Sequence, residues 1–127
     1  MKPVLAALML SNAALFVFGA VQHSGVAIGP FHEPRIIPAS IVETVCALGL
    51  IWGVNAILTG SPKARRYALI GNFVAIAGVA IGMVALAAGA GPRTASNDFY
   101  HKIMLALAGA SLLILFIPSG RRALTER

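Results

Sequence analysis

Four long blocks that are almost free of charge dominate this chain of 127 residues. They cover residues 3–21, 36–59, 67–89 and 99–117, and none contains more than one charged side chain. A helix of about 20 predominantly apolar residues is long enough to cross the hydrocarbon core of a bilayer. The blocks therefore predict four membrane-spanning α-helices within a single domain of residues 1–127.

Composition narrows the class of protein further. Only 11% of the residues are charged and 58% are hydrophobic, whereas an ordinary soluble domain has about 25% charged residues. The single Cys46 cannot form an internal disulfide. Lysine and arginine lie in short connectors between apolar blocks rather than on one solvated face, which argues against a nucleic-acid partner. The sequence indicates an integral membrane protein whose main surroundings are the lipid bilayer.

Glycine and proline mark the connectors between the blocks. They fall at Gly25, Gly29, Pro30, Pro34 and Pro38, then at 60–62 and at 91–92, where a helix would lose backbone hydrogen bonds or be interrupted. Short connectors favour an antiparallel, up-down-up-down four-helix bundle. We expect Asn97 or Asp98 to cap the fourth helix, and Pro118 with Gly120 to end it.

The distribution of basic residues predicts an orientation in the membrane. Three basic residues lie near one end of the predicted bundle (Arg35, Arg93 and Lys102), and seven lie near the other (Lys2, Lys63, Arg65, Arg66, Arg121, Arg122 and Arg127). Lysine and arginine in short loops concentrate on the cytoplasmic side. We therefore expect a multi-pass protein of the cell membrane, the inner membrane in a bacterium, with both termini cytoplasmic.

Small residues predict where the helices approach closely. Gly71, Gly78 and Gly82 recur at steps of seven and four residues in the third block, and Gly49 and Gly53 lie in the second. Membrane helices pack through such small residues. The contacts are expected either within the bundle or between copies of the chain in a homo-oligomer.

The histidines and most of the acidic residues fall near the predicted external end. All three histidines are there, as are three of the four acidic residues: His23, His32, His101, Glu33, Glu43 and Asp98. An ionisable group inside a span costs roughly 2.5–3.5 kcal/mol on insertion scales and is usually turned toward the protein interior. We expect any functional site at this end.

Glu43 is the main candidate in this group. A helix that begins near Ile36 places it about 10 Å along the axis at 1.5 Å per residue. A carboxyl group in such a position can exchange protons. It can equally be a structural partner of Arg35, His23 or His101, and the sequence leaves both interpretations open.

His101 lies three residues after Asp98, so the two side chains can share one helical face. An aspartate bonded to this imidazole would orient it for proton transfer or for metal binding. Alternatively, Asp98 caps the helix and pairs with Lys102. His23, His32, Glu33 and His101 are ligand types that suit Zn, Cu or Fe, although their spacing forms no compact metal motif.

Two segments resemble the DoxX-like small four-helix bacterial membrane proteins. The first helix ends in Phe18-Gly19-Ala20-Val21-Gln22-His23, and the second contains Ile41-Val42-Glu43 followed by Leu48-Gly49-Leu50-Ile51-Trp52-Gly53. His23 stands where that family often has lysine. The resemblance implies a small inner-membrane protein associated with quinone or thiol redox systems, with Glu43 and the 19–23 segment as its functional region.

Three functional classes remain open from the sequence. The first is an accessory or partner-binding membrane component, with a redox or quinone-linked system as its setting. The second is a small proton-coupled transporter that uses Glu43. The third is a metal- or quinone-dependent oxidoreductase, with quinone or a metal ion as its cofactor. We find no Ser/His/Asp spacing typical of a catalytic triad. Of the three classes, we expect the non-enzymatic one.

Overall fold

The computed structural model describes residues 1–30 and 33–125 and is all-α. Its helices are α1 (Lys2–His23), α2 (Ile37–Leu58), α3 (Ala64–Ala87), α4 (Ala95–Phe116) and α5 (Pro118–Thr125). The first four are each long and apolar enough to cross a membrane. The prediction of four long apolar helices is confirmed, and their length and composition suit a multi-pass membrane protein.

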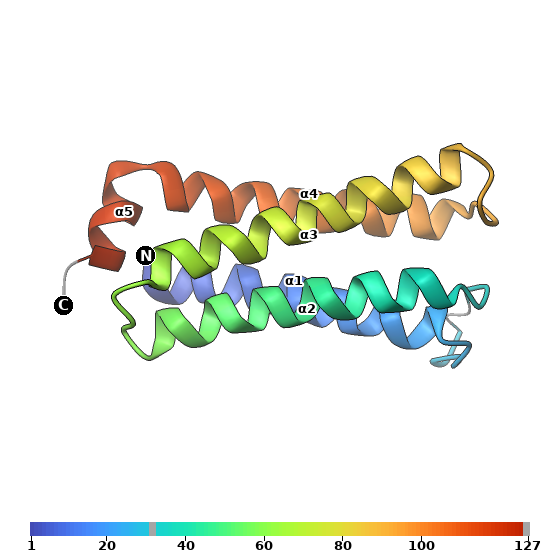
Figure 1. The fold of residues 1–127 in the computed structure, drawn as a ribbon, viewed down its shortest axis with the longest axis horizontal. Coiled ribbons are helices and arrows are strands. Elements are labelled where there is room, and N and C mark those ends of the chain that lie inside the picture. Colours follow the sequence, from blue (N-terminus) through green and yellow to red (C-terminus); the bar gives the residue numbers. More distant parts are fainter. Residues whose placement is uncertain (31–32, 126–127) are drawn as a thin grey trace.

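The four long helices pack side by side along the long axis of the molecule (Figure 1). Helix α2 packs extensively against α1 and α3, while α4 packs less extensively against α3 and α1. The chain reverses direction at each connector, so the N-terminus, α5 and the 59–63 connector share one end, here called the terminal end. The connectors at 24–36 and 88–94 form the opposite end, here called the connector end.

Helix α4 begins four residues before its predicted start. The backbone N–H of Asn97 donates to the Thr94 hydroxyl over 3.1 Å, so Thr94 is the N-cap. This bond satisfies one of the amides that a helix start leaves without an intrahelical acceptor. The prediction of Asn97 or Asp98 as the cap is wrong, because both lie inside the first turn of the helix.

Helix α5 is absent from the prediction, which took Pro118 as a terminator. Ile117 has an extended backbone with ψ of 147°, the conformation favoured before proline. Pro118 then begins a new helix, where its missing N–H removes no hydrogen bond. A Cβ on Gly120 would overlap the Ile114 carbonyl oxygen, so this glycine lets α5 turn back against the end of α4.

Helix α3 begins at Ala64, three residues before the predicted span, and therefore includes Arg65. The Arg65 Nε donates to the Leu115 carbonyl over 3.3 Å, and its guanidinium lies 5.8 Å from the Phe116 ring centroid. A long basic side chain can pack its apolar stem against neighbouring helices while its head remains at the membrane boundary. This contact ties the start of α3 to the end of α4.

Glycines lie where α2 and α3 approach most closely. A Cβ on Gly71 would lie 2.5 Å from the Gly49 carbonyl oxygen, and one on Gly53 would lie 3.0 Å from the Ala68 Cα. A Cβ on Gly78 would overlap the Cys46 sulfur. These contacts are within the bundle, so the small residues bring the backbones of α2 and α3 together in a single chain.

Large apolar side chains fill the centre of the bundle. The fully buried ones include Leu5, Met9, Phe16, Leu50, Met104 and Leu115. The Asn12 Nδ2 donates to the Met104 carbonyl over 3.2 Å and joins α1 to α4 at mid-depth. Polar groups thus assist packing inside the bundle, while the ionisable ones lie toward the connector end.

Candidate functional site

A buried pair of ionisable side chains joins α1 to α2 near the connector end. His23 is the last residue of α1, and its Nδ1 lies 2.9 Å from Oε2 of Glu43. The two residues are 3% and 6% exposed. Of the three partners considered for Glu43, the structure selects His23.

Two hydrogen bonds near this pair fix the distance between α1 and α2. The Ile36 N–H donates to the His23 carbonyl over 2.9 Å, which closes the 24–36 connector onto the end of α1. The Ser40 hydroxyl donates to the Ala20 carbonyl over 2.7 Å. These two bonds hold α2 against α1, so the imidazole and the carboxyl group meet with little freedom to separate.

Gly19 makes room for two polar groups beside α1. A Cβ at this position would overlap both the Tyr100 hydroxyl and the Glu43 carboxyl group. The Tyr100 hydroxyl donates to the Leu15 carbonyl and so joins α4 to α1. Tyr100 was not predicted as part of the site. Its position near the outer end of a span, where tyrosine is common, is the one signal in the sequence that could have drawn attention to it.

His101 reaches the same region from α4. It is 6% exposed, and its ring lies 3.5 Å from the position of a Cβ on Gly82 in α3. No side chain or backbone group among residues 1–30 and 33–125 forms a hydrogen bond with its buried Nδ1. Gly82 therefore provides space for an imidazole, in contrast to Gly78 deeper in α3, which faces a sulfur.

Asp98 lies apart from these residues. Its Oδ2 is 2.8 Å from Nη2 of Arg93, whose side chain is largely exposed. The interpretations that joined Asp98 to His101 or to Lys102 are therefore corrected. A spacing of three residues permits contact with His101, but the flexible Arg93 side chain just before α4 reaches the carboxylate from the solvent side.

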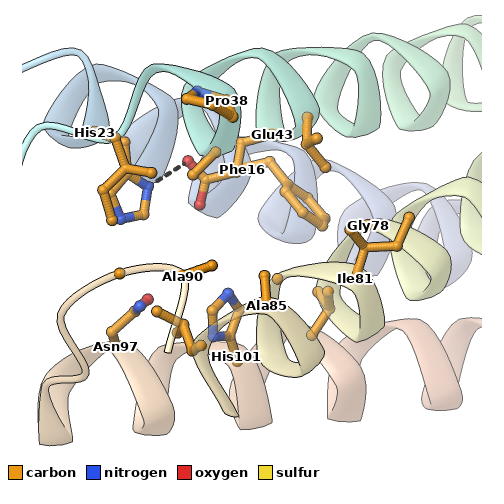
Figure 2. Close-up of a pocket in the computed structure, with 17 residues that line it drawn as sticks. Phe16, His23, Pro38, Glu43, Gly78, Ile81, Ala85, Ala90, Asn97 and His101 are labelled. Atoms are coloured by element: carbon orange, nitrogen blue, oxygen red, sulfur yellow. Dashed lines mark hydrogen bonds and ion pairs between the residues drawn. The ribbon is translucent and has the colours of Figure 1, made fainter. Parts of the chain in front are cut away.

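A cavity of about 230 Å³ separates the His23–Glu43 pair from His101, and we call it the membrane cavity. Figure 2 shows the pair on one wall, and His101 with Asn97 on the facing wall. The remaining lining is apolar and comes mainly from α2 and α3, including Phe16, Val42, Val79, Ile81, Ala85 and Leu86. An apolar hollow with a few convergent polar groups is the usual form of a small-molecule site.

Among the described residues, the structure does not bring the predicted metal ligands together in one place. The Glu33 carboxylate accepts hydrogen bonds from Thr94 and Ser96 at 3.0 and 2.5 Å. It thereby joins the 24–36 connector to the start of α4. His32 lies outside the described residues. Within residues 1–30 and 33–125, no three His, Cys, Asp or Glu side chains are grouped so that they could hold a metal ion.

Comparisons of the chain with protein-family models, with curated proteins and with solved structures find no match. The resemblance to DoxX-like proteins therefore stays a prediction. The features of this chain that bear on its function are the two walls of the membrane cavity and the polar groups that they present.

Proposed function

We propose that this protein is a small integral membrane component of a redox system, and that it binds a quinone-type ligand in the membrane cavity. The observation that supports this most is the placement of polar groups on two facing walls of an otherwise apolar cavity. The protein supplies hydrogen-bonding groups and a proton-accepting pair. Electrons would come from a partner protein, so the role is that of an accessory, partner-binding component.

The size and the polarity of the cavity favour a ring with oxygens at opposite edges. Its volume of about 230 Å³ is below the range of roughly 300–1,000 Å³ that is usual for drug-sized ligands. It therefore suits the head of a ligand rather than a whole large molecule. A para-quinone would present one oxygen to His101 and the other to the His23–Glu43 pair. The first contact would satisfy the buried Nδ1 of His101.

Access from the lipid is also consistent with such a ligand. Ile81 lines the cavity and is 61% exposed on the apolar surface of α3. The cavity thus reaches the face of the bundle that lipid chains would cover. An apolar tail could extend through this opening while the polar head remains between α2 and α4.

His101→Leu is expected to weaken binding of decylubiquinone by about 5- to 150-fold. This range corresponds to the roughly 1–3 kcal/mol associated with losing one partner of a buried hydrogen bond. The measurement is equilibrium binding to the protein in lipid nanodiscs, with empty nanodiscs subtracted. Ser111→Ala is the matched control, because Ser111 is also buried in α4 but its hydroxyl donates to Leu107 of the same helix.

Decylbenzene provides a control for the ligand, since it has a ring and a tail but no oxygens. It is expected to bind no more tightly to the wild type than to His101→Leu. Equal affinity of decylubiquinone for wild type and His101→Leu would contradict the proposal. So would decylbenzene binding as tightly as the quinone, because the cavity would then select only apolar volume.

The proposed function also includes an orientation, with both termini in the cytoplasm and the membrane cavity near the external face. The excess of lysine and arginine at the terminal end supports it. In a bacterial host, alkaline phosphatase inserted into the 88–94 connector is expected to be active, and a fluorescent protein fused at the C-terminus to be fluorescent. The exchanged fusions serve as controls, and the opposite pattern would reverse the assignment.

A further inference from the structure

A second cavity lies next to His23, on the side of α1 and α4, and we call it the connector cavity. Its volume is about 340 Å³, and its walls come from the end of α1, the 24–36 connector and the start of α4. Pro30 and Ser96 line it and are exposed, so it opens at the connector end. The membrane cavity is lined by α2 and α3 as well, which distinguishes the two.

His23 belongs to both cavities. It lines the membrane cavity together with Glu43, whereas Glu43 does not line the connector cavity. The His23 Nδ1 is bonded to the Glu43 carboxyl group. Its Nε2 is buried and has no hydrogen-bond partner among the described residues. The His23 imidazole therefore lies between the Glu43 carboxyl group and the connector cavity.

The connector cavity is suited to hold water. Gln22 is 4% exposed, lines this cavity, and has a buried Nε2 with no partner among residues 1–30 and 33–125. Ser96 and Glu33 add oxygen atoms nearer the opening. A buried water typically forms about three hydrogen bonds to polar groups that are otherwise unsatisfied. The amide of Gln22 and the imidazole of His23 would be two such partners.

We infer that the connector cavity is an aqueous entrance through which Glu43 exchanges protons with the solution at the connector end, and that His23 is the relay. The geometry gives each atom a role. A hydronium ion in the connector cavity donates a proton to Nε2 and becomes water, and the proton already on Nδ1 passes to Oε2 of Glu43. The imidazole is left protonated on Nε2, and reorientation of the ring, which turns this new N–H toward Glu43, restores the starting arrangement and completes the exchange.

Charged and titratable groups surround His23 on several elements. Glu43 faces it from α2, and His101 and Tyr100 approach from α4. Glu33 lies on the connector and acts on His23 through its charge. From α3, the lining of the membrane cavity consists of apolar residues and glycines between Gly78 and Leu86. Among these groups, the Glu43 carboxyl is the one hydrogen-bonded to the imidazole.

Infrared spectroscopy of the unliganded protein in nanodiscs tests the route. The C=O stretch of protonated Glu43 is the band that Glu43→Gln removes. After transfer from H₂O to D₂O at an acidic pH, the rate at which this band shifts reports proton exchange at Glu43. His23→Gln is expected to slow this exchange by about 100-fold, the lower end of what a positioned acid–base group contributes. Ser111→Ala is the control, because Ser111 lies in the C-terminal half of α4, far along the helix from the connector end. This variant is expected to exchange at the wild-type rate.

Two further variants keep the test decisive if His23→Gln does not fold. Gln22→Leu removes a water-binding group from the connector cavity without changing the pair, and it should also slow exchange. Wild-type exchange rates in whichever of Gln22→Leu and His23→Gln fold would overturn the inference. So would slowing confined to Tyr100→Phe, or the absence of a Glu43 band at every pH at which the protein is folded. Because no quinone is present, failure of ligand binding and failure of this route give separate results.

Discussion

Gly71→Ala is expected to lower the free energy of unfolding by about 1–3 kcal/mol, the usual cost of overpacking. The added methyl group would lie 2.5 Å from the Gly49 carbonyl oxygen and 2.9 Å from its carbonyl carbon. Both are backbone atoms, so no side-chain rotation relieves the contact and α2 must move away from α3. Gly109→Ala is the matched control, because nothing lies within 4 Å of a Cβ there. It should be neutral or stabilise α4 by up to about 1 kcal/mol.

A pair of aromatic rings reports this separation directly. Trp52 of α2 stacks on Tyr67 of α3 with ring centroids 4.3 Å apart. Unfolding in mixed micelles of increasing SDS fraction can therefore be followed by the fluorescence of the single tryptophan. Equal stability of Gly71→Ala and Gly109→Ala would show that α2 and α3 do not make the close backbone contact described above.

Glu43→Leu is expected to destabilise the protein by about 3–5 kcal/mol, the range for removing one partner of a buried ionic pair. His23→Leu should have an effect of similar size. The double variant His23→Leu/Glu43→Leu should recover much of this loss, because replacing both partners by apolar residues of similar volume is often neutral or stabilising. The expected pattern is thus two destabilised single variants and a more stable double variant.

The same SDS titration measures all four proteins of this cycle. The coupling between residues in contact typically amounts to 0.5–3 kcal/mol. If the double variant loses the sum of the two single effects, His23 and Glu43 act independently and the pair does not stabilise the bundle. Ser40→Ala, which removes the nearby bond from α2 to the Ala20 carbonyl, gives the scale for losing a neutral hydrogen bond between the same helices.

The four spans could be predicted because the bilayer sets their length and excludes charge. Their boundaries were less accurate where local chemistry extends a helix beyond its apolar block. Thr94 extends α4 by accepting an amide hydrogen bond, and Arg65 lies inside α3 because its long side chain reaches the Leu115 carbonyl. Helix α5 was missed because Pro118 is compatible with both the end of one helix and the start of another.

The site was only partly predictable for a related reason. Glu43, His23 and His101 could be singled out, because ionisable groups inside spans are rare. Their partners depend on contacts between helices, which spacing along the chain does not fix. Asp98 is three residues from His101 but pairs with Arg93. The resemblance pointed to the 19–23 segment, but the reason that Gly19 is needed appears only in three dimensions, where α2 and α4 bring polar atoms to it.

The His23–Glu43 bond also bears on how the chain enters the membrane during synthesis. It joins the first two helices, which are adjacent in sequence and linked by one connector. Helices α1 and α2 can therefore leave the insertion machinery together as a helical hairpin. In this hairpin the imidazole and the carboxyl group, which are each costly to place in hydrocarbon, can already be hydrogen-bonded to each other. Helix α4, which carries His101 and packs less extensively, is synthesised last of the four spans. Its arrival would then complete the membrane cavity around a pair that the first hairpin can form without it.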